Sequence, residues 1–371
     1  MGTPEHLDAF AVAAPGLAPV LAAELAGLGV AAGRVAPEGV EFRTDLAGLC
    51  RVNLCSRTAS RVLVRIARFR AAHFDELVKG ATVVDWQRWI EPGSAVRFRV
   101  TCSKSRLYHQ RAVEERLRGV LGAEGAVPDD DGLAALVVVR IHRDQCTLSI
   151  DSSGELLHRR GYRLATAKAP LRETLAAALL LACGWDGGRP LVDPFCGSGT
   201  VAIEGALLAR QMAPGAGRGF ALERWPWADG AVLEQVRRQV AAAVLPRAPA
   251  PIRGPDRDEG AVAAARANAE RAGVLGDVVL ERSPVSDLRA PPGVGLVLTN
   301  PPYGLRVRGG KDLRDLYDRF GQVLRGDFRG WQVAVLGTDR SLVGRLQLDL
   351  EAQLRTTNGG VPVTLFVGTV P

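Results

Sequence analysis

The sequence predicts an α/β fold in which a doubly wound, mostly parallel sheet follows smaller α+β units. The chain has 371 residues, more than one domain usually holds. After about residue 170, strand-like and helical segments alternate regularly, as they do in parallel sheets. The earlier half mixes the same signals without this alternation. We therefore expect two or three domains, with a boundary in the Gly-, Arg- and His-containing stretch 152–168.

The first half begins with an amphipathic helix. Residues 17–28 carry Ala, Leu and Glu at helical spacing and follow a turn at Pro15 and Gly16. Helical periodicity predicts a second helix at 110–121. Runs of β-branched and apolar residues predict strands at 61–69, 95–101, 136–141 and 146–150. This mixture is typical of small α+β units.

The second half opens with a Leu- and Ala-rich helix at 170–182, with Pro170 in its first turn. The alternating segments that follow predict strands at 190–192, 252–253, 278–281, 295–299 and 332–336, and helices at 201–209, 260–272 and 315–324. Asn358-Gly359 predicts a terminal hairpin, which adds an antiparallel strand at or near the sheet edge. The Gly- and Pro-containing stretch 211–251 is an excursion between the first strand–helix unit and the second.

Composition excludes several classes of protein. Hydrophobic residues make up 47% and charged residues 23%, which argues against a disordered chain. No run of roughly 18 uncharged apolar residues is present, so we predict no membrane span. Glu5 and Asp8 stand where a secretory signal would carry basic residues, and we expect a cytoplasmic monomer.

Net charge and cysteine spacing do not identify a partner for this protein. The net charge of +7 is compatible with a polyanionic partner without demanding one. The six cysteines contain no Cys-x-x-Cys pair, and the five histidines are dispersed. We therefore predict free thiols and no metal site.

The first motif with chemical content is Leu191-Val192-Asp193-Pro194-Phe195-Cys196-Gly197-Ser198-Gly199-Thr200. A predicted strand enters a Gly-rich turn that opens a helix, so the backbone can approach a ligand closely at the carboxyl edge of the sheet. The alternative is a tight turn without a ligand. Dinucleotide binding would need an acid roughly 20 residues further on, whereas the next acid at a strand end is Asp256.

The second motif is Asn300-Pro301-Pro302-Tyr303, directly after a buried strand. Proline removes backbone donors and leaves carbonyl oxygens as acceptors, and the Asn300 amide supplies another. Two converging acceptors suit an exocyclic NH₂ group, and Tyr303 offers a ring on which a base can stack. The alternative is a polar turn, which would not explain why acceptors and an aromatic ring gather at this point.

Together these motifs resemble motifs I and IV of class I S-adenosylmethionine-dependent amino-methyltransferases. The stretches 151–163 and 169–177 resemble the junction of THUMP-domain RNA guanine-N2 methyltransferases, the bacterial family that includes the N-terminal half of the large-subunit rRNA enzyme and the tRNA position-6 enzymes. The likeness covers nearly the whole chain. It implies a ferredoxin-like domain at 1–70, a THUMP RNA-binding domain at 71–153, a linker at 154–168 and a Rossmann-like methyltransferase domain with a seven-stranded sheet at 169–371.

The resemblance also implies roles for individual residues. Asn300, Pro301 and Tyr303 would hold the target amine and its base. The residues implied for binding S-adenosylmethionine are Asp193, Phe195, Gly197, Ser198, Gly199, Thr200 and Asp256, with Glu173, Thr174 and Asp287 as further candidates. One position departs from the family, because Pro284 stands where an acid usually reads the adenine. Either Asp287 or Ser283 substitutes for that acid, or backbone and packing alone hold the adenine.

Basic groups are the expected contacts to RNA phosphates. They cluster in the acid-free stretch 51–70, around residues 104–111 and around residues 158–163. The alternative for each arginine is a solvated surface position without contact to RNA. Trp86, Trp89, Trp225 and Trp227 are expected to pack rather than stack on bases. The candidates for RNA contact are Arg57, Arg61, Lys104, Arg106, Arg159, Arg160 and Arg163.

The resemblance implies methyl transfer to a guanine N2 amine in structured RNA, with 23S rRNA favoured over tRNA. Two other classes remain open. A DNA or protein amino-methyltransferase would share the Asn-Pro-Pro-Tyr segment, and a non-catalytic RNA-binding factor would be consistent with the departure at Pro284.

Overall fold

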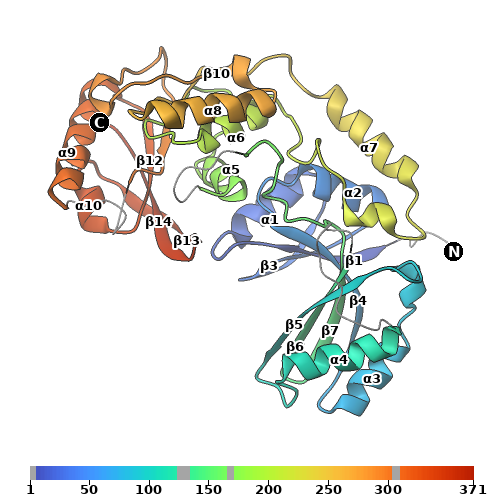
Figure 1. Ribbon diagram of the computed structural model, residues 1–371. Coiled ribbons are helices and arrows are strands. Elements are labelled where there is room, and N and C mark those ends of the chain that lie inside the picture. Colours follow the sequence, from blue (N-terminus) through green and yellow to red (C-terminus); the bar gives the residue numbers. More distant parts are fainter. Residues whose placement is uncertain (1–5, 123–133, 165–170, 303–309) are drawn as a thin grey trace. The chain divides into compact units, whose positions relative to one another are not determined.

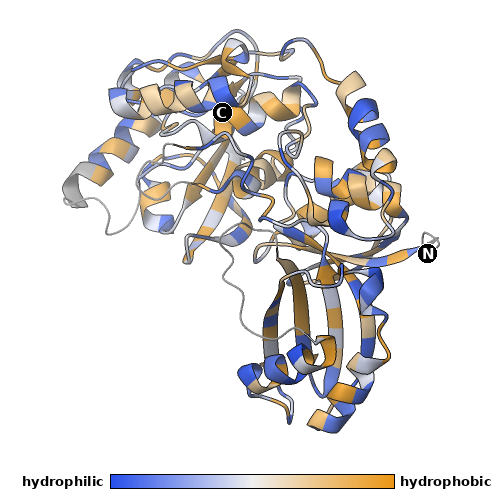
Figure 2. Cartoon of the chain, turned by 45° about the vertical axis from the view of Figure 1, so that its right-hand side comes forward, coloured by the Kyte–Doolittle hydropathy of each residue, from blue (hydrophilic) through white to orange (hydrophobic). Residues whose placement is uncertain are grey.

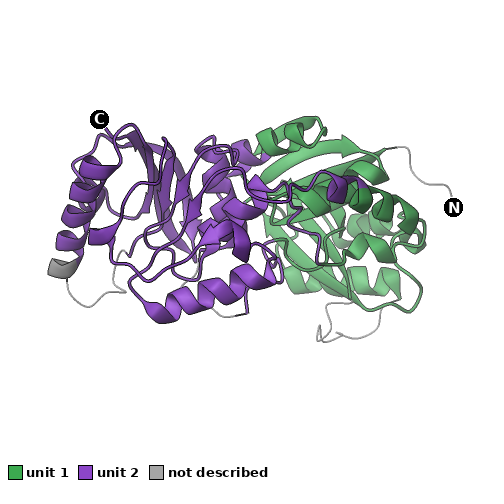
Figure 3. Ribbon diagram, turned by 90° about the horizontal axis from the view of Figure 1, so that it is seen from above, with its two compact units in different colours: residues 1–13, 22–157, 218–238 green, residues 14–21, 158–217, 239–371 purple. Residues whose placement is uncertain are grey.

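The computed structural model describes residues 6–122, 134–164, 171–302 and 310–371. The chain forms two compact units, coloured separately in Figure 3. The first unit contains residues 1–13, 22–157 and 218–238, and the second contains residues 14–21, 158–217 and 239–371. Each unit has its own seven-stranded sheet.

The sheet of the first unit has the strand order β2-β3-β1-β4-β7-β6-β5. Its central strand, β4, pairs antiparallel with β1 on one side and with β7 on the other (Figure 1). The ten residues of β4 therefore join the strands of both predicted N-terminal domains into one continuous sheet. The strands are β1 (Leu7–Val12), β2 (Ala32–Ala36), β3 (Gly39–Thr44), β4 (Arg61–Arg70), β5 (Val96–Ser103), β6 (Ala135–His142) and β7 (Gln145–Asp151).

Helices cover this sheet with their apolar residues. In α4 (Gln110–Leu121), Val113 and Leu117 are buried, and Gly122 ends the helix in the left-handed conformation. Figure 1 shows α3 (Phe74–Thr82) beside α4 over strands β5 to β7. The other helical segments are α1 (Ala18–Gly27), α2 (Leu46–Cys55) and the 3₁₀ turn η1 (Trp86–Arg88).

The second unit is the predicted doubly wound sheet, with the order β10-β9-β8-β11-β12-β14-β13. Strands β8 to β12 run parallel, and β14 pairs antiparallel with β12. The predicted hairpin is confirmed, with β13 at the edge. The strands are β8 (Leu191–Val192), β9 (Ile252–Arg253), β10 (Val278–Val279), β11 (Leu296–Thr299), β12 (Gln332–Gly337), β13 (Glu351–Asn358) and β14 (Val361–Thr369).

Helices and short turns complete the second unit. One core cluster of this unit buries Tyr317, Phe320, Phe328 and Trp331 with residues of strands β11 and β12. The helices are α5 (Glu173–Ala182), α6 (Thr200–Ala209), α8 (Glu259–Arg271), α9 (Gly310–Asp327) and α10 (Arg340–Gly344), with 3₁₀ turns η3 (Leu275–Asp277) and η4 (Val285–Asp287). No helix among the described residues is long and apolar enough to cross a membrane.

The structure corrects the predicted bounds of several elements, most of all the helix predicted at 315–324, which spans Gly310–Asp327. The helix predicted at 170–182 begins at Glu173, and Pro170 lies outside the described residues. The strand predicted at 278–281 is paired as a strand only at Val278–Val279. The excursion at 211–251 contains the 3₁₀ turn η2 (Ala221–Arg224) and helix α7 (Gly230–Ala242), in which hydrophilic and hydrophobic residues alternate (Figure 2).

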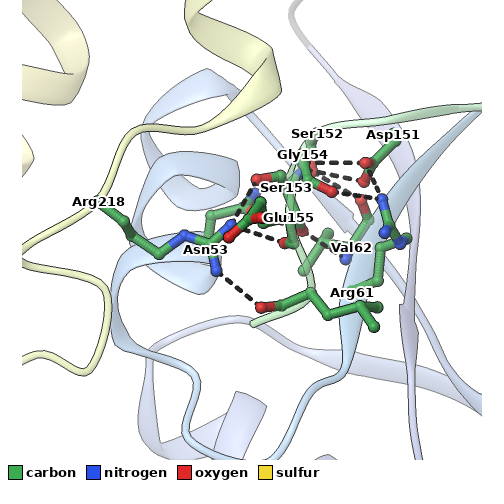
Figure 4. Close-up of polar contacts among 10 residues, drawn as sticks. Asn53, Arg61, Val62, Asp151, Ser152, Ser153, Gly154, Glu155 and Arg218 are labelled. Carbon is green, nitrogen blue, oxygen red and sulfur yellow. Dashed lines mark hydrogen bonds and ion pairs between the residues drawn. The ribbon is translucent and has the colours of Figure 1, made fainter. Parts of the chain in front are cut away.

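Two short segments belong to a different unit from their neighbours in the sequence. Residues 14–21 belong to the second unit, where Gly16 adopts φ +77° and a Cβ there would lie 1.9 Å from the carbonyl oxygen of Arg355. Residues 218–238 belong to the first unit, where Arg218 donates to the carbonyl oxygens of Ser153, Glu155 and Leu156 (Figure 4). The excursion therefore contributes part of the first unit's packing.

A buried polar cluster lies at the end of β7 (Figure 4). The Asn53 amide donates to Ser152 Oγ at 2.9 Å and accepts from Ser153 Oγ at 2.7 Å. Ser152 Oγ donates to the Val62 carbonyl oxygen at 2.8 Å. Asn53, Ser152 and Ser153 are at most 1% exposed, so each group depends on these protein partners.

Substituting Asn53→Ala should lower the free energy of unfolding by about 1–3 kcal/mol, because it removes two buried hydrogen bonds, the one that Ser152 Oγ accepts and the one that Ser153 Oγ donates. Urea denaturation of the full chain measures the change. The control Arg43→Ala breaks an ion pair with Asp8 whose side chains are 70% and 71% exposed, and it should cost less than about 1 kcal/mol. Equal effects of the two substitutions would contradict the role assigned to the cluster.

Candidate active site

The two sequence motifs meet at the carboxyl edge of the second unit's sheet. Strands β8 and β11 are parallel neighbours, and Asp193 and Asn300 are the residues that follow them. Thr299 Oγ1 donates to Asp193 Oδ1 at 2.6 Å, which ties the ends of the two strands together. Ligands of open α/β sheets bind outside this edge.

The Gly-rich turn after β8 exposes its backbone. Gly197 and Gly199 have φ values of +52° and +82°, which favour glycine. A Cβ at Gly197 would meet nothing within 4 Å, whereas one at Gly199 would lie 3.0 Å from Ala265 Cβ. The first glycine therefore leaves open space over the turn, and the second allows close packing against α8. Ser198, whose carbonyl oxygen accepts from Asn268 at 3.1 Å, and Thr200 at the start of α6 are both buried.

Asp256 lies beside this turn. Its Oδ2 accepts from the Gly197 amide at 2.9 Å, and its Oδ1 accepts from the Asp258 amide at 2.9 Å. These bonds fix the carboxylate at the end of β9, next to the open space at Gly197. Phe195 packs edge to face on Phe320 at a centroid distance of 5.3 Å, which anchors the turn to the core.

Asp193 is a buried acid at the centre of the site. Burial raises the pKa of Asp193 to about 7, the hydrogen bonds from Thr299 and Phe195 oppose this shift, and the nearby Asp256 carboxylate adds to it. The groups that stabilise its ionised form are the Thr299 hydroxyl and the Phe195 amide.

The structure describes part of the second motif. Asn300 is half-buried, and its Oδ1 is buried without a hydrogen-bond partner in the described part of the chain. Pro301 is buried, and the Pro302 carbonyl oxygen accepts from Tyr317 at 3.4 Å. Tyr303 lies outside the described residues. An unsatisfied buried acceptor is costly, which marks Asn300 Oδ1 as a binding position for a donor.

Glu173 and Thr174 are buried at the start of α5. The Glu173 carboxylate pairs with Arg163 at 3.3 Å, and Arg163 also donates to Thr200 Oγ1 at 2.6 Å and to the Leu171 carbonyl oxygen at 2.8 Å. Burial raises the pKa of Glu173, and the Arg163 guanidinium opposes this. Arg163, which sequence reasoning placed among the RNA contacts, thus lies against the Gly-rich turn and connects it to α5.

Some of the other residues predicted to contact RNA are buried in ion pairs, and others are exposed. The side chain of Arg160 is 3% exposed and pairs with Glu204 at 3.6 Å. Arg61 pairs with Asp151 and donates to the Gly154 carbonyl oxygen. Lys104, Arg106 and Arg159 are exposed, and Arg57 is half-buried. The predicted tryptophan packing is found for Trp89, whose ring meets those of Trp225 and Trp227 edge to face.

Pro284, the position that departs from the family, follows the third strand of the unit, β10. Pro284 is exposed and precedes η4, and Asp287 is exposed with its Oδ1 accepting from Ser286 Oγ at 3.0 Å. The Ser283 amide donates to the Asp256 carbonyl oxygen at 2.9 Å, so Ser283 lies beside Asp256. In the described ranges, no group of three or more His, Cys, Asp or Glu side chains has the arrangement of a metal site.

A parallel α/β sheet with this motif pair at its carboxyl edge defines a class I methyltransferase. The family model described as "RMKL-like, methyltransferase domain" matches residues 160–365, and models of the RlmL ferredoxin-like domain and the THUMP domain match residues 8–63 and 71–151. The chain belongs to the RMKL-like methyltransferase family. The predicted family and fold class are confirmed.

Individual relatives agree with this assignment. The Synechocystis protein named "Putative RNA methyltransferase slr0064" is 35% identical over 96% of this chain and 95% of its own length. Ribosomal RNA large subunit methyltransferase K/L of Methylococcus capsulatus is 36% identical over 98% of this chain, which spans 51% of that protein. The crystal structure of SMU.472 complexed with SAH has a TM-score of 0.89 at 28% identity and covers 99% of both chains.

The raised pKa of Asp193 predicts how binding of S-adenosylmethionine, the cofactor that the resemblance implies, depends on pH. The Asp193 carboxylate predominates above about pH 7 and is protonated below it. Because a cationic ligand favours the carboxylate, its affinity should fall by up to about tenfold per pH unit below this pKa. Calorimetry from about pH 8 to about pH 5 measures the slope. Asp193→Asn should bind more weakly at pH 8 and with a flatter profile, and an unchanged profile would refute the assignment.

The buried pair of Arg163 and Glu173 predicts strongly coupled substitutions. Arg163→Met should lower the free energy of unfolding by about 3–5 kcal/mol, because Glu173 is left buried without its cation. Adding Glu173→Gln should restore at least half of the loss. Urea denaturation measures both variants, and Arg282→Met, which breaks an exposed pair with Glu259, serves as the control. A double variant no more stable than the single one would contradict the coupling.

Proposed function

We propose that this protein transfers a methyl group from S-adenosylmethionine to the N2 amine of a guanosine in structured RNA, with 23S rRNA favoured over tRNA. The coarser activity, RNA methylation, is that of the family. The observation that carries the proposal is the buried Oδ1 of Asn300 at the end of β11, which has no hydrogen-bond partner among the described residues. An amine N–H would satisfy this acceptor.

The cofactor is S-adenosylmethionine, because the methyltransferase domain model matches and SMU.472 is complexed with SAH, the demethylated form. The residues present fit it. The open space over Gly197 admits a ligand to the turn, Asp193 suits its cationic methionine portion, and Asp256 suits its ribose hydroxyls. When bound, S-adenosylmethionine supplies an activated methyl group on a sulfonium.

The chain's own residues act by positioning. Asn300 Oδ1 accepts a hydrogen bond from the guanine N2 amine, and the Pro301 carbonyl oxygen accepts a second. These bonds favour the tetrahedral form of the nitrogen, whose lone pair is otherwise delocalised into the ring. Holding two reactants in line is worth roughly 7–11 kcal/mol, so no strong general base is needed. The target base leaves its stack at a cost of a few kcal/mol.

The choice of RNA as the substrate rests on the domains before the methyltransferase, and the choice of guanine rests on the family resemblance of the sequence. The chain carries a THUMP domain, and curated relatives that match it across both units are named for methylation of large-subunit rRNA. Since the chain spans about half the length of those K/L relatives, their whole activity is carried over only as a proposal. Exposed Lys104, Arg106 and Arg159 are the groups we assign to RNA phosphates.

Asn300→Ala should reduce methylation by at least about 100-fold while RNA affinity stays within about twofold, because the substitution removes an acceptor for the amine alone. Unmodified 23S rRNA and tRNA are incubated with methyl-labelled S-adenosylmethionine and digested to nucleosides. The expected label is N2-methylguanosine from rRNA. Gln322→Ala removes an exposed amide from α9 and is the matched control.

Other results would overturn parts of the proposal. Label in N6-methyladenosine would refute the base assignment, and label in tRNA alone would replace the favoured substrate. Normal turnover by the Asn300→Ala variant would refute the role of the residue. Failure of the wild-type protein to bind S-adenosylmethionine in calorimetry would favour a non-catalytic RNA-binding protein.

A further inference from the structure

An exposed aromatic ring projects from the loop between β5 and α4. Tyr108 is 68% exposed, and it is the one aromatic residue among the exposed large hydrophobic side chains of the described residues. Its ring lies beside that of the exposed His109, with a centroid distance of 4.0 Å and an interplanar angle of 40°. An exposed aromatic face next to basic residues can stack on a nucleic-acid base, so the ring is a candidate contact surface.

The loop that carries this ring is held in one shape. Lys104 adopts φ +50°, and Ser105 Oγ donates to the Ser103 carbonyl oxygen at 2.9 Å. Asp144, in the turn between β6 and β7, accepts from the Arg106 amide at 2.8 Å and donates its own amide to Ser105 Oγ at 3.0 Å.

The residue before Tyr108 completes this anchoring. Leu107 is 6% exposed and fixes the loop in the core of the first unit. The tyrosine ring is therefore presented from a preorganised backbone, and a ligand that stacks on it pays little for ordering the loop.

Basic residues belong to the same loop and to the elements next to it. Lys104 and Arg106 precede Tyr108 in the loop, and both are exposed. Arg143, in the neighbouring β6–β7 turn, is also exposed, and Arg111 in the first turn of α4 has a side chain that is 92% exposed. The carboxylate of Glu115 lies 3.4 Å from Arg111, an exposed pair that is easily exchanged for a phosphate.

From this juxtaposition we propose that the loop 104–109 binds an unpaired nucleotide of the RNA, with its base stacked on Tyr108 and its phosphates held by Lys104 and Arg106. The inference rests on the proposed function for the class of partner, RNA. It adds the state of that RNA, because a paired base within a duplex keeps its faces stacked on its neighbours and offers no face to the ring. A single-stranded loop or end offers both a free base and a flexible backbone.

The test compares two RNAs of equal length and charge, one single-stranded and one a blunt duplex, by fluorescence anisotropy without S-adenosylmethionine. Tyr108→Ala should weaken binding of the single strand by about 5- to 150-fold, the range for loss of one stacked base, and leave duplex binding unchanged. Tyr108→Phe should retain wild-type affinity because it retains the ring. Val83→Ala removes another exposed apolar side chain, 81% exposed, and is the matched control.

The salt dependence of RNA affinity tests the proposed phosphate contacts. Lys104→Ala should weaken binding to both RNAs and reduce the slope of log affinity against log salt by about 0.7–0.9. Unchanged single-strand affinity in Tyr108→Ala, or an equal loss on single strand and duplex, would overturn the stacking role. A surface that docks another protein would give the first of these results.

The same samples separate this inference from the proposed function. Methylation of RNA by a Tyr108→Ala variant that binds single strands normally would refute the loop's role alone. Single-strand binding that depends on Tyr108, in a protein that labels no guanosine, would refute the proposed reaction alone. Absence of RNA binding by the wild-type protein would refute both.

Discussion

The hydrogen bond between Thr299 and Asp193 links the ends of β8 and β11, and the geometry of the candidate active site follows from that link. It sets the Gly-rich turn after one strand next to the Asn-Pro-Pro segment after the other. Each motif alone is a turn. Placed side by side at one sheet edge, they bring together a space open to a ligand and an acceptor that has no partner among the described residues. The short strand β8 achieves this because its neighbours β9 and β11 run parallel to it.

The buried acids of the second unit differ in the groups that compensate their charge. Glu173 and Glu204 are buried opposite Arg163 and Arg160, so each carboxylate has a guanidinium that compensates its desolvation. Asp193 is equally buried, but hydroxyl and amide groups are the favourable contributors to its ionised form. A carboxylate maintained at this cost is typical of a binding site. This contrast separates Asp193 from the structural acids more clearly than its place in the sequence does.

The sequence was sufficient for most of the fold and for the centre of the site. Helices such as 110–121 and strands such as 61–69 have strong periodicity, and their residues contact near neighbours, so local pattern determines them. The continuous sheet through β4 was not foreseeable, because strand pairing between β4 and β7 depends on contacts about 80 residues apart. The packing of residues 218–238 with the N-terminal unit was missed for the same reason. Composition marked only the longer stretch 211–251, which is rich in Gly and Pro toward its two ends, as an excursion.

The arginines show why charge in a sequence is a poor guide to nucleic-acid contact. In a chain with 47 basic residues, the basic group at 158–163 supplies buried ion pairs through Arg160 and Arg163, and Arg61 pairs with Asp151. A guanidinium serves such roles well, because it stays ionised and donates in several directions at once. Exposed side chains at turns remain as candidates for a phosphate. The loop 104–109 carries two of them and adds an exposed ring, so local exposure and anchoring, rather than net charge, are the grounds on which we propose it as a surface for RNA.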